Sequence, residues 1–200
     1  MNDAVQADFV RNENNAGLED GPARAQAEGD AWFSEIARAS LAPPHRLAAE
    51  DHLAIIELTG MWDAAYDALD REFWLSCLAE DFVFASRGFG EFNGRAAMAD
   101  YFDTYRKVFH GLRHVLSNHI VVGESPTTAR GYCYLTVFER ITGTAMLGTS
   151  PFYDRYVKQD GRWLFQRRDQ VVDPGMTQTA PGQRLMAGFA ELFAAPATST

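Results

Sequence analysis

The sequence has few cysteines and no long apolar run. Its 200 residues include only two cysteines, Cys77 and Cys133, and neither belongs to a CxxC motif or has a histidine at ligand spacing. We therefore expect two reduced, buried thiols. No stretch approaches the ~18 apolar residues of a membrane helix, and the N-terminus lacks a signal-peptide pattern. These absences predict a cytoplasmic protein with no membrane partner.

Positive charge is scarce as well. The chain has 18 Lys and Arg against 27 Asp and Glu, which gives a formal net charge of −9, and its basic residues form no run. Nucleic acids and anionic membrane surfaces repel such a chain. Neither is expected as a partner.

Motifs for metals, nucleotides and nucleophilic catalysis are missing. A metal site needs three or four convergent ligands, whereas His114 and His119 are five residues apart and face opposite sides of a predicted strand. Gly88 and Gly90 lack the strand-to-helix context of a dinucleotide fingerprint. No GxSxG elbow occurs. We expect an activity without a metal or an organic cofactor, and His119 to be structural or exposed.

Aromatic residues, in contrast, are abundant. They make up 12% of the chain, as 14 Phe, 7 Tyr and 4 Trp, within a hydrophobic fraction of 46%. So many rings indicate a large core, a ring-lined cavity, or both. An apolar cavity in turn favours a small, mostly apolar ligand.

The order of periodic segments predicts an α+β fold. Helical spacing of apolar residues comes first, then long extended segments, with a hairpin signal at Asp160-Gly161. We therefore expect helices packed on a strongly curved antiparallel sheet that encloses a cone-shaped pocket. Helices are expected at 47–69, 71–80 and 95–109, and strands at 82–86, 112–123, 128–140, 144–158 and 162–172.

The same pass along the chain divides it into three parts. Residues 1–46 are expected to be an N-terminal arm, polar or disordered to about residue 28, with a short helix at 30–40. Residues 47–174 form the main domain, and residues 175–200 a tail with an amphipathic helix at 183–194. The arm and the tail helix are candidates for covering the pocket mouth or a neighbouring subunit.

Four strings within residues 47–172 stand out: ALDREFWLSCLAEDFVF (68–84), FNGRAAMADYF (92–102), LRHVLSNHIV (112–121) and FYDRYVKQDGRWLFQRR (152–168). In their order and spacing they resemble the SnoaL-like branch of the nuclear-transport-factor-2-like superfamily. The resemblance implies a cone-shaped α+β barrel, self-association as dimers or trimers, and cofactor-independent chemistry. Its enzymes are lyases of the dehydratase, elimination or deformylating type, and isomerases; other members share the fold without the chemistry.

The resemblance also implies a catalytic pair. Dehydratase and dehydrochlorinase relatives use an Asp at the end of the first helix and a His on the first long strand, and these roles fall here on Asp70 and His114. The dehydratase has a second His on a later strand, where this sequence has Thr149 and Ser150. A mechanism with two histidines is therefore not expected.

Helical spacing points to the same pair. Asp70 follows Trp62 and Tyr66 at intervals of four, so a helix that reaches residue 70 would turn its carboxylate inward, where it needs a partner. His114 is the candidate partner, because a carboxylate fixes the imidazole tautomer and makes the other nitrogen a better general base. The alternatives are an Asp70 exposed at a helix end and a His114 satisfied in the core.

Further polar side chains are candidates for acid catalysis or substrate binding. Tyr66 lies one turn before Asp70, Tyr134 is placed on a pocket-facing strand, and Asn118 shares a strand face with His114. A purely structural role is the alternative for each. Arg140, Arg167 and Arg168 are expected at solvated strand edges rather than on a charged substrate group. The predicted catalytic residues are His114, Asp70 and Tyr66, and the predicted substrate-binding residues are Tyr134, Asn118, Tyr101, Tyr105, Phe84, Trp62 and Phe138.

Two functions follow from these patterns. The first is a cofactor-independent lyase or isomerase that abstracts a proton from a small aromatic substrate, as in the catabolism of aromatic compounds. The alternative is a ligand-binding or subunit-assembly member of the same fold without catalysis.

Overall fold

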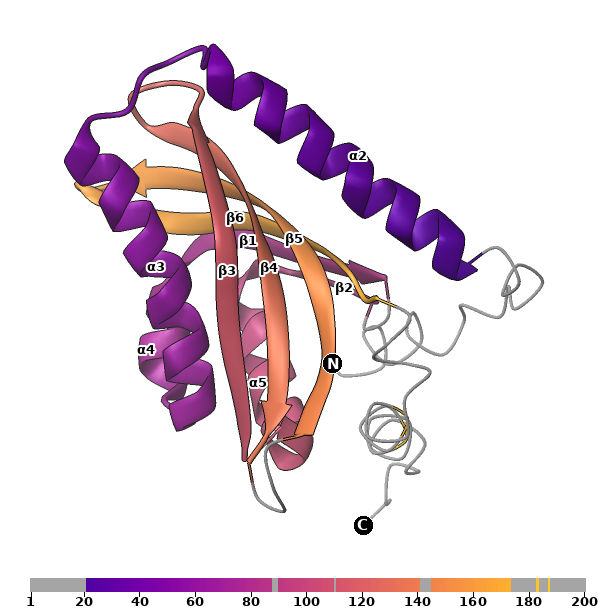
Figure 1. The fold of residues 1–200 in the computed structure, drawn as a ribbon. Coiled ribbons are helices and arrows are strands. Elements are labelled where there is room, and N and C mark those ends of the chain that lie inside the picture. Colours follow the sequence, from indigo (N-terminus) through magenta and orange to yellow (C-terminus); the bar gives the residue numbers. More distant parts are fainter. Residues whose placement is uncertain are drawn as a thin grey trace.

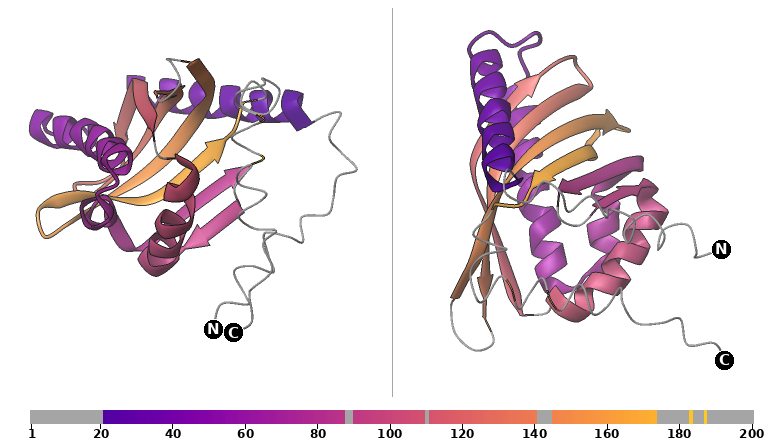
Figure 2. Two further views of the ribbon diagram at one scale, coloured as in Figure 1. Left: turned by 90° about the horizontal axis from the view of Figure 1, so that it is seen from below. Right: turned by 90° about the vertical axis from the view of Figure 1, so that its right-hand side faces the viewer.

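The computed structural model describes residues 21–87, 90–109, 111–140 and 145–173, together with residues 183 and 187. In this part of the chain a curved sheet has helices on both of its faces (Figures 1 and 2). The helices are α2 (Gly21–Leu41), α3 (Ala49–Ala68), α4 (Arg71–Ser76) and α5 (Gly94–Phe109). The strands are β1 (Leu78–Arg87), β2 (Gly90–Asn93), β3 (Leu112–Gly123), β4 (Thr128–Glu139), β5 (Ala145–Gln159) and β6 (Arg162–Val171).

The six strands form one open sheet in the order β2-β1-β6-β5-β4-β3. All neighbours are antiparallel except β1 and β6, which run parallel. The predicted fold class, helices on a strongly curved and mainly antiparallel sheet, is therefore confirmed. The parallel pair and the short strand β2 are the departures, because they depend on which strands meet and not on local periodicity.

The hairpin between β5 and β6 follows its predicted turn. Asp160 and Gly161 have φ angles of 50° and 79°, so both central residues are left-handed. A type I′ turn needs this geometry, and Asp-Gly supplies it at low steric cost. The turn brings Gln159 opposite Arg162 and sets the register of the two strands.

Helix α3 ends one residue earlier than predicted. Leu69 adopts a left-handed conformation, φ 59°, and its N–H bonds back to the carbonyl of Tyr66. The chain then turns, and Asp70 becomes the N-cap of α4, where its carboxylate accepts a hydrogen bond from the Phe73 N–H. Asp70 is therefore exposed and does not face the interior.

Two β-bulges change which side chains face the concave side of the sheet. In β3 the bulge lies between Ser117 and Ile120, and Asn118 takes a left-handed φ of 55°. After it, His119 shares the concave side with Leu116, so the prediction that His119 and His114 face opposite ways is wrong. In β6 an extra residue, Gln166, has a similar effect on the residues that follow it.

Hydrophobic residues gather on both faces of the sheet. The larger cluster fills the concave face under α3, α4 and α5 and contains the free, buried thiols of Cys77 and Cys133, as predicted for both cysteines. A smaller cluster joins α2 to the convex face through Ile36, Val122 and Tyr132. Figure 2 shows α2 on the side of the sheet away from α5.

Helix α2 is longer than the helix predicted at 30–40. It begins at Gly21, so residues 21–28 are helical rather than part of a disordered lead. The predicted helix at 183–194 lies outside the described residues. Among the helices that are described, none combines the length and the apolarity needed to cross a membrane.

Candidate active site

A narrow cavity lies between α3 and the concave face of the sheet. Its volume is about 40 Å³, which is room for a few water molecules but not for an aromatic ring. A ring-sized ligand must therefore displace some of the side chains around it. The lining residues are Trp62, Asp63, Tyr66, Trp74, Phe84, Tyr101, His114, Leu135, Val137, Phe152 and Gln170.

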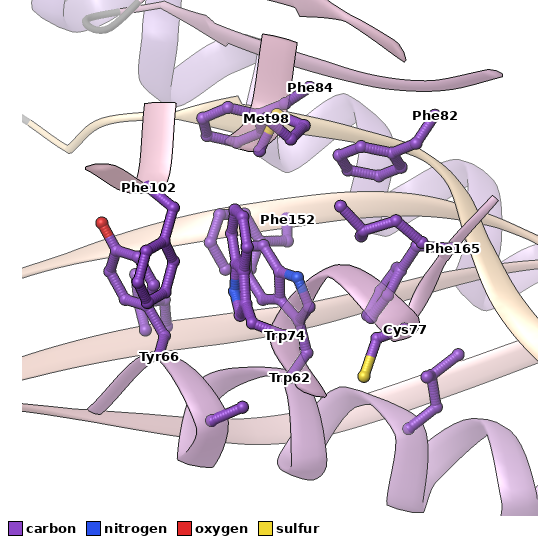
Figure 3. Close-up of a cluster of buried hydrophobic side chains, with 14 of the residues drawn as sticks. Trp62, Tyr66, Trp74, Cys77, Phe82, Phe84, Met98, Phe102, Phe152 and Phe165 are labelled. Atoms are coloured by element: carbon purple, nitrogen blue, oxygen red, sulfur yellow. The ribbon is translucent and has the colours of Figure 1, made fainter. Parts of the chain in front are cut away.

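Stacked rings form most of this lining. Trp62 stacks on Trp74 with ring centroids 5.0 Å apart, and Trp74 stacks on Tyr101 at 6.2 Å. Figure 3 shows Trp62 and Tyr66 extending from the same helix toward Trp74. These contacts make the site apolar and exclude bulk water, which strengthens any electrostatic interaction inside it.

His114 and Asp67 form a hydrogen-bonded pair at this cavity. The Nδ1 atom of His114 lies 2.6 Å from Oδ1 of Asp67, and the backbone N–H of His114 donates to Oδ2 at 3.0 Å. The two side chains are 8% and 5% exposed. Asp67 therefore fixes both the ring and the backbone of His114.

This pairing defines the chemistry of the imidazole. An ionised carboxylate only accepts hydrogen bonds, so Nδ1 of His114 carries the proton and Nε2 is the basic nitrogen. Arg113 forms an ion pair with the same carboxylate, with its Nε 3.3 Å from Oδ2 of Asp67. The geometry is that of a general base held by a carboxylate.

Asp63 is a second carboxyl group at the cavity. It lies one helical turn before Asp67 on α3, is 5% exposed, and its Oδ2 has no hydrogen-bond partner among the described residues. Burial raises its pKa from 3.8 to about 6, although His114 and Arg168 oppose the shift. About half of Asp63 is therefore still a neutral carboxylic acid at pH 6, where an exposed aspartate is almost fully ionised.

Phenol groups belong to the same lining, and one of them contacts the histidine. The ring of Tyr66 packs edge-on against His114, with centroids 5.5 Å apart, and Tyr101 stacks on Tyr105 at 4.1 Å. Burial raises the pKa of Tyr66 well above its usual range, and that of Tyr101 also rises. These hydroxyls are therefore neutral hydrogen-bond donors and not bases.

A buried ion pair lies behind the rings. Arg168 donates from Nε and Nη2 to the two carboxylate oxygens of Asp154, each at 2.8 Å, and both side chains are fully buried. The guanidinium carbon is 4.6 Å from the ring centre of Trp62 and 4.0 Å from that of Phe152. The bulge at Gln166 turns Arg168 inward, which the expectation of a solvated strand edge had missed.

Gln170 provides a fixed amide in the lining. Ser86 donates to its Oε1 at 2.8 Å, and its Nε2 donates to Ser150 at 3.3 Å. Thr149 instead donates to Asp173. At Thr149 and Ser150, where a second histidine was considered, Ser150 therefore holds the neutral amide of Gln170 instead.

The structure brings five of the predicted site residues together. They are Trp62, Tyr66, Phe84, Tyr101 and His114, and all of them line the cavity. Tyr105 is fully buried behind Tyr101. Their roles in substrate binding and catalysis remain predictions.

The other four predicted site residues lie elsewhere. Asp70 caps α4 and does not bond His114. Asn118 is exposed on the bulge of β3. Tyr134 packs against Tyr132 in the cluster under α2, and Phe138 shares that strand face, so both face away from the cavity. In β4 the inward residues are Leu135 and Val137, because the face that contains the tyrosines covers the convex side.

Sequence reasoning missed the two carboxylates that matter most here. Asp63 and Asp67 are four residues apart and directly follow Trp62 and Tyr66, so helical spacing alone could have placed both on the inner side of α3. The pairing of Asp67 with His114, 47 residues away, comes from the packing of α3 on β3. Within the described residues, no group of three acidic, histidine or cysteine side chains could hold a metal ion.

Comparisons with known proteins agree with this architecture. Residues 48–169 match the model of a family described as the SnoaL-like domain. A solved protein of unknown function from Nostoc punctiforme, with a cystatin-like fold, is 30% identical over 65% of this chain and 96% of its own, with a TM-score of 0.61. No match is found among curated proteins.

Two other solved structures are also similar. An NTF2-like protein from Novosphingobium aromaticivorans is 26% identical over 68% of this chain and 88% of its own, with a TM-score of 0.57. A protein of unknown function from Mycobacterium tuberculosis is 24% identical over 71% of this chain and 88% of its own, with a TM-score of 0.63. The second likeness shows the fold alone.

Proposed function

Because this chain belongs to the SnoaL-like domain family, we propose that it is a cofactor-independent enzyme that acts by proton abstraction. Its reaction is that of a lyase or an isomerase, and its substrate is a small, mostly apolar, aromatic molecule. The observation that carries the proposal is the 2.6 Å pair of His114 and Asp67 at a ring-lined cavity.

The proposed mechanism assigns the base to His114. Its Nε2 removes a proton from a carbon of the substrate, and the imidazolium that forms is stabilised by the carboxylate of Asp67. Tyr66, beside the imidazole, is placed to donate a hydrogen bond to the negative charge that develops on the substrate. This division of roles needs no group from outside the chain.

The lining supports the proposed substrate class. Aromatic and aliphatic side chains dominate it, and stacking on Trp62 or Trp74 favours a flat, unsaturated molecule. The charged Arg168 is already occupied by Asp154 and lies behind the rings, so a strongly anionic substrate is not favoured. Binding must open the cavity, since its present volume is too small for a ring.

The test begins with ligand discovery and continues with turnover. Native mass spectrometry of the purified protein with a panel of phenolic, steroid and polyketide-like compounds identifies binders, and each binder is then incubated with wild type and variants. We expect His114→Ala and Asp67→Asn to lower kcat by roughly 10²- to 10⁴-fold, the range typical of general-base catalysis. Asp67→Asn presents an amide to Nδ1 and removes the charge that stabilises the imidazolium.

Asp70→Asn is the matched control. Asp70 has the same charge and lies only three residues beyond Asp67, but it caps α4, and Asn caps a helix equally well. Its turnover should equal that of the wild type. Equal losses in Asp67→Asn and Asp70→Asn would contradict the assignment of the pair. A compound that binds without being converted by the wild type would support the binding-protein alternative instead.

A further inference from the structure

Unsatisfied polar atoms gather in the otherwise apolar cavity. Besides Oδ2 of Asp63, the indole nitrogens of Trp62 and Trp74 are buried and have no hydrogen-bond partner among the described residues. All three residues belong to the lining. A buried donor or acceptor without a partner costs free energy, so such groups persist where a ligand satisfies them.

We propose that Asp63 is a second catalytic residue of this site, a general acid that protonates an oxygen atom of the substrate while His114 removes a proton from carbon. The inference rests on the proposed function and deepens it. It assigns the substrate to aromatic molecules in which a hydroxyl, ether or carbonyl oxygen lies a few bonds from an acidic C–H. The indole N–H groups of Trp62 and Trp74 would bind that same oxygen.

The geometry on α3 supports two separate roles for the two carboxyls. Asp67 holds His114 through the imidazole and the backbone N–H, and it also forms an ion pair with Arg113. Asp63 lies one turn away on the same helix, where Cβ atoms four residues apart are ~5–6 Å from each other. Asp63 and His114 both line the cavity, so the proposed acid and the proposed base face the same space. Asp63, in contrast, has an oxygen without a hydrogen-bond partner among the described residues and a pKa raised by burial.

Charged and titratable groups from one helix and four strands act on the pKa of Asp63. Desolvation raises its pKa, and the neighbouring charges partly cancel one another. A bound ligand that displaces the remaining water would raise the pKa of Asp63 further. The titratable and charged groups that face it are Tyr66 and Asp67 on its own helix, His114 on β3, Cys133 on β4, Asp154 on β5 and Arg168 on β6.

The proton balance closes without a further reactant. In an elimination, the C–H electron pair forms the new π bond, the bond from carbon to the leaving oxygen breaks, and that oxygen receives the proton of Asp63. His114 then carries one extra proton and Asp63 has lost one. Transfer of that proton from the imidazolium to the carboxylate, directly or through water, restores both groups.

Two related probes separate the acid from the base. 1,2-Benzisoxazole and its 5-nitro derivative both open when a base removes the C3 proton and the N–O bond breaks. The nitro compound releases a stable phenolate that needs no protonation, whereas the parent compound releases a more basic oxygen. We expect Asp63→Asn to slow the parent compound at least tenfold and the nitro compound less than threefold, on the order of a general-acid contribution.

The controls distinguish this inference from the proposed function. His114→Ala should slow both probes, Asp70→Asn neither, and Asp63→Glu should recover part of the loss on the parent compound. If His114→Ala slows both probes while Asp63→Asn affects them equally, Asp63 is not the acid but the proposed base stands. A wild-type protein that accelerates neither probe counts against both proposals.

A second measurement does not depend on activity. In protein labelled with ¹³C at aspartate carboxyls, the resonance that disappears in Asp63→Asn should titrate near pH 6, the pKa that burial gives Asp63. The wild-type rate on 1,2-benzisoxazole should fall as pH rises through the same range, and this fall should be absent in Asp63→Asn. A resonance that titrates at the ordinary carboxyl value would overturn the inference.

Discussion

At the scale of single residues, burial decides how the charged side chains at the cavity behave, because little water reaches them. Asp63, Asp67, Asp154 and Arg168 are all buried, and of the three carboxyl groups only that of Asp63 has a buried oxygen without a hydrogen-bond partner among the described residues. A paired carboxylate keeps its charge, while an unpaired one in an apolar site holds its proton. The same chemical group therefore serves as an anchor at Asp67, a structural partner at Asp154, and a proton donor at Asp63.

Asp63 should also lower stability at neutral pH. Its pKa in the folded protein, about 6, lies above the ordinary value of 3.8. The folded state therefore binds this proton more tightly than the unfolded chain, and the associated stability is complete below the ordinary pKa and is lost as pH rises through about 6. We expect Asp63→Asn to be more stable than wild type by about 2–3 kcal/mol at neutral pH.

Urea denaturation at several pH values checks this expectation. The gain in Asp63→Asn should shrink as pH falls and disappear below the ordinary pKa of the carboxyl, because the wild-type group is then neutral in both states. Asp70→Asn, which alters an exposed carboxylate, is the control. A gain that does not vary with pH would show that Asp63 is not buried as a neutral acid.

At the scale of single elements, the end of α3 decides which aspartate reaches the histidine. Leu69 adopts a left-handed conformation, which costs a residue other than glycine about 1–2 kcal/mol. That turn ends the helix after Ala68, so Asp67 stays on the inner face while Asp70 starts the next helix. The β-bulges of β3 and β6 have comparable effects on His119 and Arg168.

Leu69→Gly tests the strain at this turn. Glycine adopts positive φ readily and is the usual residue at a helix C-terminus. The side chain of Leu69 is 41% exposed, so its removal costs little packing. Thermal denaturation should show Leu69→Gly to be more stable than wild type by about 0.5–1 kcal/mol, whereas Leu69→Ala, which keeps the strain, should show no gain. A less stable Leu69→Gly would mean that the side chain contributes more than the strain costs.

At the scale of the whole molecule, the sheet separates two hydrophobic clusters, one on each of its faces. The concave face holds the cavity and the large ring-rich cluster, and the convex face holds α2. The residues that match the family model begin at 48, so α2 is an addition to the shared domain. The expectation that the protein forms dimers or trimers remains a prediction that native mass spectrometry can check.

Ile36→Ala tests whether α2 stabilises the domain from outside. Ile36 is fully buried against Val122 and Tyr132, so its truncation should lower the free energy of unfolding by about 2–4 kcal/mol. Leu41, which is 86% exposed on the same helix, is the control, and Leu41→Ala should change stability by less than about 0.5 kcal/mol. Turnover should be unchanged in both, because the cavity lies on the other face. Equal stability of the two variants would mean that α2 does not dock in solution.

The sequence by itself determined the element types, because hydrophobic periodicity and turn chemistry are local. It predicted α3, α5, the four long strands, the Asp160-Gly161 turn, the fold class, and the rings of Trp62, Phe84 and Tyr101 that line the cavity. It also placed His114 at the cavity, because the resemblance implied a histidine on the first long strand; the catalytic role of His114 stays a prediction.

Only the tertiary structure decided which residues meet. A single left-handed residue moved the partner of His114 from Asp70 to Asp67, and bulges at Asn118 and Gln166 reversed the side-chain alternation that sequence reasoning assumes. Tyr134 and Phe138 were predicted to face the cavity but lie on the convex side of the sheet. Alternation along a strand gives two faces but does not say which one is concave. Periodicity fixes a repeat, whereas the contacts that select a face and a partner come from elements far apart in the chain.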